Sequence, residues 1–111
     1  MSKVVNIRAS ELRKNGFKNF FHWNSLPENV YIGRENPYLG IPASIFANPY
    51  KIRDFDRKTV LKMYEKYIRN SPELLKRIYH LKAKNLGCYC YPDACHGDIL
   101  IKILNEMVNS T

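Results

Sequence analysis

Long apolar runs are missing from this sequence of 111 residues. No stretch approaches the roughly 20 apolar residues that a membrane-spanning helix needs, and the first ten residues lack the apolar region of a secretory signal. Repeats and low-complexity segments are missing too, and 45% hydrophobic with 25% charged residues is an ordinary globular composition. We therefore expect an intracellular protein that is not secreted, has no membrane partner and forms a single domain over residues 1–111.

Acidic residues are the scarce charge. Ten Asp and Glu stand against 18 Lys and Arg, so the net charge is +8, and the surplus lies mainly in residues 1–70 without any run of five like charges. Such a surplus favours polyanionic partners, and a solvated basic surface is an equally good interpretation. Aromatic residues interleave with the basic ones, which would suit stacking on single-stranded bases and would equally suit a core.

Cysteine is scarce as well, and all three lie within eight residues, followed directly by His96. A disulfide is not expected in a chain without secretory features, and an odd number leaves one thiol over. Three interpretations stay open. Cys88, Cys90, Cys95 and His96 would form a zinc site, although their spacing is not that of a zinc finger. Cys95, His96 and Asp98 would form a catalytic or anion-binding group in which a helix N-terminus lowers the pKa of Cys95. In the third interpretation the cysteines are buried packing residues, and His96 and Asp98 cap the helix.

Turn-forming residues punctuate the middle of the chain. Residues 33–54 hold three prolines and two glycines, which predicts an irregular and functional segment. Residues 17–28 are predicted to form a loop with a helical turn that packs Phe20, Phe21 and Trp23 inward.

Short strands and amphipathic helices are predicted around these loops. Asp56 and Ser71 are expected to cap two helices, Asn85 is expected to end the second of them, and the segment 30–32 is expected inside the sheet. The order is strand 4–7, strand 30–32, helices after residues 56 and 71, strand 86–90 and a helix from about residue 95. This order predicts an α/β fold, a small single domain with a short, mainly parallel sheet and flanking helices.

Three separated motifs carry a resemblance to a known family. They are VYIGR at 30–34, ANPY at 47–50 and LGCYCYPDACHGDIL at 86–100. Over about residues 29–105 they resemble the family catalogued as domain of unknown function 4326, found in phages, bacteria and large DNA viruses. Tyr89 stands where members usually have Trp, and Phe46-Ala47 where they usually have Trp or Gly before the Asn-Pro pair. The Cys-His pattern is also similar to domain of unknown function 488, which favours a ligand pocket over an isolated zinc knuckle.

The resemblance implies which residues belong together: the Cys-His cluster with Gly33, Arg34, Asn48 and Arg57. Because these residues also fall at predicted strand ends and loops, we expect one pocket at the carboxyl ends of the strands. The arginines would bind phosphate, Asn48 would bind a base edge, and backbone N–H groups near residues 96–98 would complete an anion site. The alternatives are arginines that are exposed or paired with carboxylates, and a plain turn at Asn48.

The expected function is binding of a nucleotide, phosphate or nucleic acid by a small domain of viral or phage type, with the question of enzymatic activity open. The alternative is a zinc-stabilised, non-enzymatic binding module or a structural component of a virion. Zinc is the cofactor that the residue types suggest, and no protein partner is indicated. The resemblance also implies a variable N-terminal segment at about 1–28 and a location in the cytoplasm of a host cell or in a virion.

Overall fold

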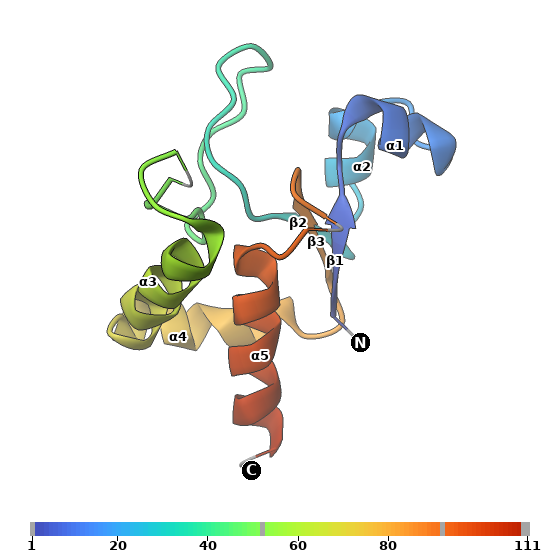
Figure 1. Cartoon of the computed structure of the whole chain (residues 1–111). Coiled ribbons are helices and arrows are strands. Elements are labelled where there is room, and N and C mark those ends of the chain that lie inside the picture. Colours follow the sequence, from blue (N-terminus) through green and yellow to red (C-terminus); the bar gives the residue numbers. More distant parts are fainter. Residues whose placement is uncertain (1, 52, 92, 110–111) are drawn as a thin grey trace.

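The computed structural model describes residues 2–51, 53–91 and 93–109, which form a small sheet with helices on both faces (Figure 1). The predicted order of strands and later helices is confirmed, and two short helices precede the second strand. The elements are β1 (Lys3–Asn6), α1 (Ala9–Lys14), α2 (Phe20–Asn24), β2 (Asn29–Tyr31), α3 (Arg57–Arg69), α4 (Pro72–Ile78), the 3-10 turn η1 (Tyr79–Leu81), β3 (Asn85–Cys88) and α5 (His96–Asn109).

The sheet is wholly parallel, with strand order β1-β3-β2. Leu86 of β3 pairs with Val4 of β1 and with Val30 of β2. Parallel neighbours need crossover connections, which the helices supply. The predicted α/β class with a short parallel sheet is therefore confirmed. The expectation that the segment at 30–32 lies inside the sheet is wrong, because β3 is the central strand.

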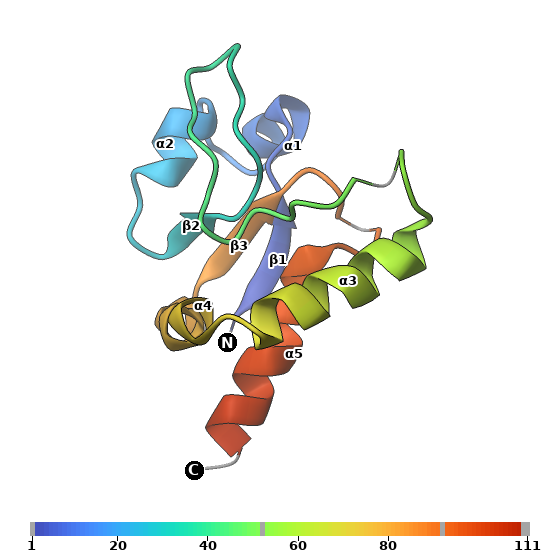
Figure 2. The same cartoon turned by 90° about the vertical axis from the view of Figure 1, so that its left-hand side faces the viewer.

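Successive side chains along each strand point to opposite faces of the sheet, and they pack into two separate cores. Leu86 and Cys88 of β3 face α3, α4 and α5, and Gly87 between them faces Trp23 of α2. Figures 1 and 2 show α1 and α2 on one side of the strands and α3, α4 and α5 on the other. The core beneath α1 and α2 is the smaller of the two and is built from Ile7, Leu12, Phe20, Trp23 and Ile41.

The caps of α3 and α4 are the predicted ones. The Asp56 carboxylate accepts the N–H of Thr59 at 2.7 Å, and the Ser71 hydroxyl accepts the N–H of Leu74 at 3.3 Å. Asn85 is not the end of a helix as predicted. The chain leaves α4 through η1, and Asn85 is the first residue of β3.

The sequence predicts only a helical turn where α2 lies and no helix at α1, because each helix is too short for an apolar stripe. In α1 only Leu12 is buried. In α2, which begins with a cap from Asn19 to the N–H of His22, Phe20 and Trp23 are buried at a spacing of three residues. Phe21 points the other way and is 54% exposed, so the prediction that it packs inward is wrong.

The predicted irregular segment is confirmed. One contact within the segment and one contact with α3 hold it in place. An isolated antiparallel bridge joins Asn36 to Ile41, and the hydroxyl of Tyr64 in α3 donates to the Phe46 carbonyl at 2.7 Å. Tyr38 lies at the tip of the loop and is 98% exposed. In Figure 1 this loop stands away from the body between α2 and α3. Among the helices of the described residues, none combines the length and apolarity needed to cross a bilayer.

Candidate functional site

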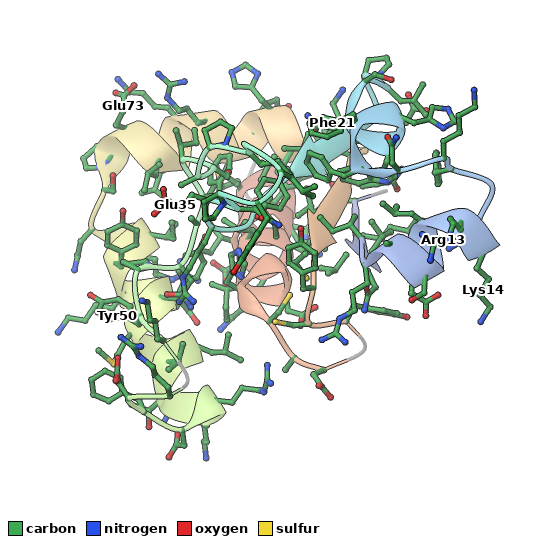
Figure 3. The ribbon with its side chains drawn as sticks, turned by 90° about the horizontal axis from the view of Figure 1, so that it is seen from above. Arg13, Lys14, Phe21, Glu35, Tyr50 and Glu73 are labelled. Carbon is green, nitrogen blue, oxygen red and sulfur yellow. The ribbon has the colours of Figure 1, made fainter. Side chains whose placement is uncertain are left out.

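A cavity of about 460 Å³ lies at the carboxyl ends of β2 and β3. The loop after β2, the segment before α3, the first turn of α3, the turn after β3 and the start of α5 form its walls. Figure 3, seen from above, shows Glu35 of the cavity wall near the middle of this end of the molecule and Tyr50 on the side of α3. The carboxyl ends of strands are where open α/β sheets bind their ligands.

Most of the residues singled out from the sequence meet at this cavity. Eight of the nine lie in its wall: Gly33, Arg34, Asn48, Arg57, Cys88, Cys90, Cys95 and His96. Asp98 is not among the lining residues. These positions come from four separate parts of the chain, so the fold brings together what the motifs leave far apart in sequence.

Arg34 organises the wall contributed by the segment before α3. Its Nε donates to the Asn48 carbonyl at 2.9 Å, and its Nη2 donates to the Tyr50 carbonyl. The side-chain oxygen of Asn48 accepts the N–H of Tyr50 at 2.9 Å, which makes a local turn. Asn48 is buried, and its amide oxygen serves its own loop. The side-chain oxygen of Asn48 therefore forms the plain turn that was the alternative to binding a base.

Arg57 lines the cavity from the first turn of α3. Its Nη1 donates to the carbonyl of Ala94 at 2.6 Å, which links the start of α3 to the turn before α5. Neither Arg34 nor Arg57 is paired with a carboxylate among the described residues. A guanidinium has five N–H donors, and these hydrogen bonds use two in Arg34 and one in Arg57. Donors of both side chains therefore remain for a ligand.

Two thiols lie in contact at the cavity wall. The Sγ atoms of Cys88 and Cys95 are 3.2 Å apart, and both residues are buried. The hydrogen bond with Cys95, helped by the backbone N–H groups of Cys90 and Tyr91, outweighs burial and lowers the pKa of Cys88 to about 6. The same shared proton raises the pKa of Cys95, and burial raises it further. The two thiols share one proton, so the lowered pKa predicted for Cys95 alone belongs to the Cys88–Cys95 pair.

The start of α5 is capped by its own side chains. The N–H of Gly97 donates to the Cys95 sulfur at 3.3 Å, and the Asp98 carboxylate accepts the N–H of Cys95 at 3.0 Å. The N–H of Asp98 bonds to the Cys95 carbonyl at 3.0 Å. The expected anion site at this helix end is therefore largely used up by capping. Asp98 acts as a capping residue, and its catalytic role stays a prediction.

His96 is held as a neutral imidazole. Its Nε2 lies 2.7 Å from the Ile32 carbonyl, and because a carbonyl only accepts, Nε2 carries the proton. Burial lowers the pKa of His96, with a smaller lowering from the nearby Arg34 charge. The ring packs edge-on against Tyr64 with centroids 5.2 Å apart. Nδ1 is then the basic nitrogen, able to accept a proton or a hydrogen bond.

The zinc hypothesis gains no support from this geometry. Within the described residues, no three His, Cys, Asp or Glu side chains group as a metal ion would require. Cys88, Cys90, Cys95 and His96 do line one cavity, with the first and third in contact. The four-ligand site therefore stays a prediction, which metal analysis tests.

The comparison with protein families gives the affiliation. A family model described as domain of unknown function (DUF4326) matches residues 13–106. The chain belongs to this family. The resemblance inferred from the motifs is confirmed, and the match begins well before residue 29, so α2 and part of α1 lie inside the DUF4326 region. Comparisons with curated proteins and with solved structures found no match.

Tyrosines are the part of the DUF4326 cavity that motif reasoning missed. Tyr31, Tyr38, Tyr50 and Tyr89 all line it. The rings of Tyr31 and Tyr89 meet edge-on with centroids 6.5 Å apart, and the Tyr31 hydroxyl donates to the Arg34 carbonyl. Burial raises the pKa of Tyr31 to about 12, so its hydroxyl stays protonated. The available signal was the interleaving of aromatic and basic residues, which does not distinguish a cavity wall from a core.

Proposed function

We propose that this protein binds a nucleotide in the cavity at the carboxyl ends of β2 and β3. The observation that carries the proposal is the combination of aromatic rings and guanidinium groups in one cavity wall. A nucleotide is a ligand with a flat aromatic base at one end and a phosphate at the other. This wall offers a surface for each end.

Tyrosine rings suit the base. Tyr38 and Tyr50 come from the irregular segment, and Tyr31 and Tyr89 come from the ends of β2 and β3. Stacking of a base on an aromatic side chain contributes about 1–3 kcal/mol. The Glu35 carboxylate is an acceptor in the same wall, suited to the hydroxyl groups of a sugar or an amino group of a base.

Guanidinium groups suit the phosphate. Arg34 and Arg57 each retain N–H donors beyond those used on backbone carbonyls, and a guanidinium binds phosphate in a bidentate manner. Their hydrogen bonds to the chain hold both groups in place before a ligand arrives. The net charge of +8 raises the local concentration of anions around the site.

The cavity dimensions favour one nucleotide over a long polymer. Its volume of about 460 Å³ lies within the roughly 300–1,000 Å³ of small-ligand sites. Binding of nucleic acid through many phosphates would fall steeply with salt, by about 10³-fold or more between 50 and 200 mM for a protein with several contacts. Binding of a single nucleotide in the cavity has a much weaker salt dependence.

Thermal unfolding with a panel of ligands tests the proposal. The panel is inorganic phosphate, nucleosides, and nucleoside mono-, di- and triphosphates with each base, and a single-stranded oligonucleotide is tested separately at two salt concentrations. A nucleotide at a hundred times its Kd stabilises the fold by about 2.7 kcal/mol. We expect a rise in Tm with at least one nucleotide that exceeds the rise with its nucleoside or with phosphate. No rise with any nucleotide would contradict the proposal.

Two arginine variants on the same helix locate the phosphate. Arg57→Gln removes a guanidinium of the cavity wall, whereas Arg69→Gln removes one that pairs with Glu65 and Glu106 away from the cavity. A charged hydrogen bond contributes about 1.5–3 kcal/mol, so Arg57→Gln is expected to weaken nucleotide binding about tenfold or more. Arg69→Gln is expected to bind like the wild type. Equal binding by both variants would remove Arg57 from the site.

A further inference from the structure

Cys88 and Cys95 are positioned as a pair by two different elements. Cys88 is the last residue of β3, and Cys95 directly precedes α5. Their sulfur atoms are 3.2 Å apart, which is closer than the ordinary nonbonded separation of about 3.5–4.0 Å between carbon atoms. A disulfide bond is about 2.0 Å long, so the two sulfur atoms need to approach by little more than 1 Å to bond.

The contacts around Cys95 fix the position of its sulfur atom beside that of Cys88. The N–H of Gly97 donates to the Cys95 sulfur at 3.3 Å, and a side chain on Gly97 would place its Cβ only 2.8 Å from a methyl group of Val4. The close packing of α5 on the sheet therefore fixes the start of the helix. Because Cys95 stands at that start, the packing also fixes the distance between the thiols.

The cavity gives small molecules a route to the pair. Both cysteines have little exposed surface, 2% for Cys88 and 3% for Cys95, yet both belong to the cavity wall. A protein surface is too large to reach these sulfur atoms, whereas a low-molecular-weight disulfide can enter a cavity of about 460 Å³. Cys90 lies in the same wall and is only partly buried, so it serves as an internal comparison.

We propose that Cys88 and Cys95 are a redox-active dithiol that exchanges with low-molecular-weight disulfides inside the cavity. Cys88, after losing its proton to solvent, attacks one sulfur of the small disulfide and releases one thiolate, which takes up a proton. Cys95 then loses its proton, attacks the Cys88 sulfur of the mixed disulfide and releases the second small thiol. In total the protein dithiol loses two electrons and two protons, and the small disulfide gains both and becomes two thiols.

This inference does not rest on nucleotide binding. It uses the position of two sulfur atoms and the access that the cavity gives them, and its test contains no nucleotide. A chain that binds no nucleotide can still form the disulfide, and a chain that binds one can fail to form it. A negative result in the nucleotide panel and a negative result in the oxidation test therefore contradict different proposals.

The test is oxidation of the intact chain in buffers of oxidised and reduced glutathione, followed by alkylation of free thiols and mass measurement. All three cysteines lie in one tryptic peptide, so mapping uses cleavage after Tyr89 by chymotrypsin and before Asp93 by endoproteinase Asp-N. The wild type is expected to lose two hydrogens, join Cys88 to Cys95 and leave Cys90 alkylated. Added reductant is expected to restore three free thiols.

Three cysteine variants sharpen the result. Cys90→Ser leaves only Cys88 and Cys95, and it is expected to form the disulfide as the wild type does. Cys95→Ser is expected to stop at a glutathione adduct on Cys88, and Cys88→Ser is expected to form no intramolecular disulfide. Circular dichroism checks that each variant is folded, and the Cys90→Ser result stands even where a buried variant is not. A disulfide that contains Cys90, its loss in Cys90→Ser, or three free thiols in oxidised wild type would overturn the proposal.

Discussion

Tyr64→Phe tests the hydrogen bond that joins the middle of the irregular segment to α3. The Tyr64 side chain is fully buried, and its hydroxyl donates to the Phe46 carbonyl at 2.7 Å. The substitution keeps the ring, which packs against His96, and removes only the donor. Burial raises the pKa of Tyr64, so the hydroxyl is protonated and donates at every pH at which the protein is studied.

The expected loss of unfolding free energy comes from the Phe46 carbonyl, which the substitution leaves without a donor. Phe46 is 4% exposed, so its carbonyl has little access to water once the donor is gone. An unsatisfied buried polar group costs about 1–3 kcal/mol, which exceeds the roughly 0.5–1.5 kcal/mol net contribution of an average hydrogen bond. With a urea m-value of roughly 1–2 kcal/mol per M, the unfolding midpoint is expected to fall by about 1 M.

Urea unfolding followed by circular dichroism measures the loss. Tyr67→Phe is the matched control, because Tyr67 lies on the same helix and is 38% exposed. We expect the control to stay within about 0.5 kcal/mol of the wild type, as surface substitutions usually do. If Tyr64→Phe is as stable as Tyr67→Phe, this hydrogen bond does not hold the irregular segment to α3.

Three further predictions concern the sheet, His96 and the exposed loop. Gly87→Ala would place a Cβ 2.4 Å from the Trp23 ring in the central strand, so we expect a loss of about 1–3 kcal/mol or more in urea unfolding, and wild-type stability would contradict it. Burial lowers the pKa of His96 below its unfolded value, so its contribution to stability is complete above about pH 6.5 and is lost as the pH falls toward the folded pKa. Unfolding at pH 7.5 and 5.5 should therefore show a smaller acid loss in His96→Gln than in the wild type, and an equal loss would refute this. Tyr38→Ala should leave Tm unchanged because Tyr38 is 98% exposed. It should weaken nucleotide binding more than Tyr79→Ala, which removes a half-exposed tyrosine that does not line the cavity, and calorimetry measures both affinities.

Much of the fold follows from local patterns in the sequence. The apolar stripe of α3 and the caps at Asp56 and Ser71 are interactions between residues that are neighbours along the chain. Such signals can be read without knowing the tertiary structure. In contrast, α2 is fixed by Phe20 and Trp23 packing on Tyr31 and Gly87 of the sheet, which no local pattern reveals.

For the candidate site, the sequence predicts the location of the cavity but not the role of each residue in it. Clustering of cysteines and the position of Arg34 at a strand end pointed to the cavity, because strand ends of a parallel sheet converge. The role of each residue depended on contacts that sequence spacing does not give. The position of Cys95 before a helix predicts a single reactive thiol, whereas the structure places its sulfur in contact with that of Cys88, so the two thiols act as a pair. The order β1-β3-β2 likewise depends on long-range pairing.

A nucleotide titration followed by nuclear magnetic resonance reports both whether a nucleotide binds this protein and which residues it contacts. The probe is the nucleotide that raises Tm most, added to isotopically labelled chain with assigned backbone amides. We expect the largest shifts on Gly33, Arg57, Tyr89 and His96, which line the cavity. Shifts confined to α1 or α4, or no shifts at any nucleotide concentration, would contradict it.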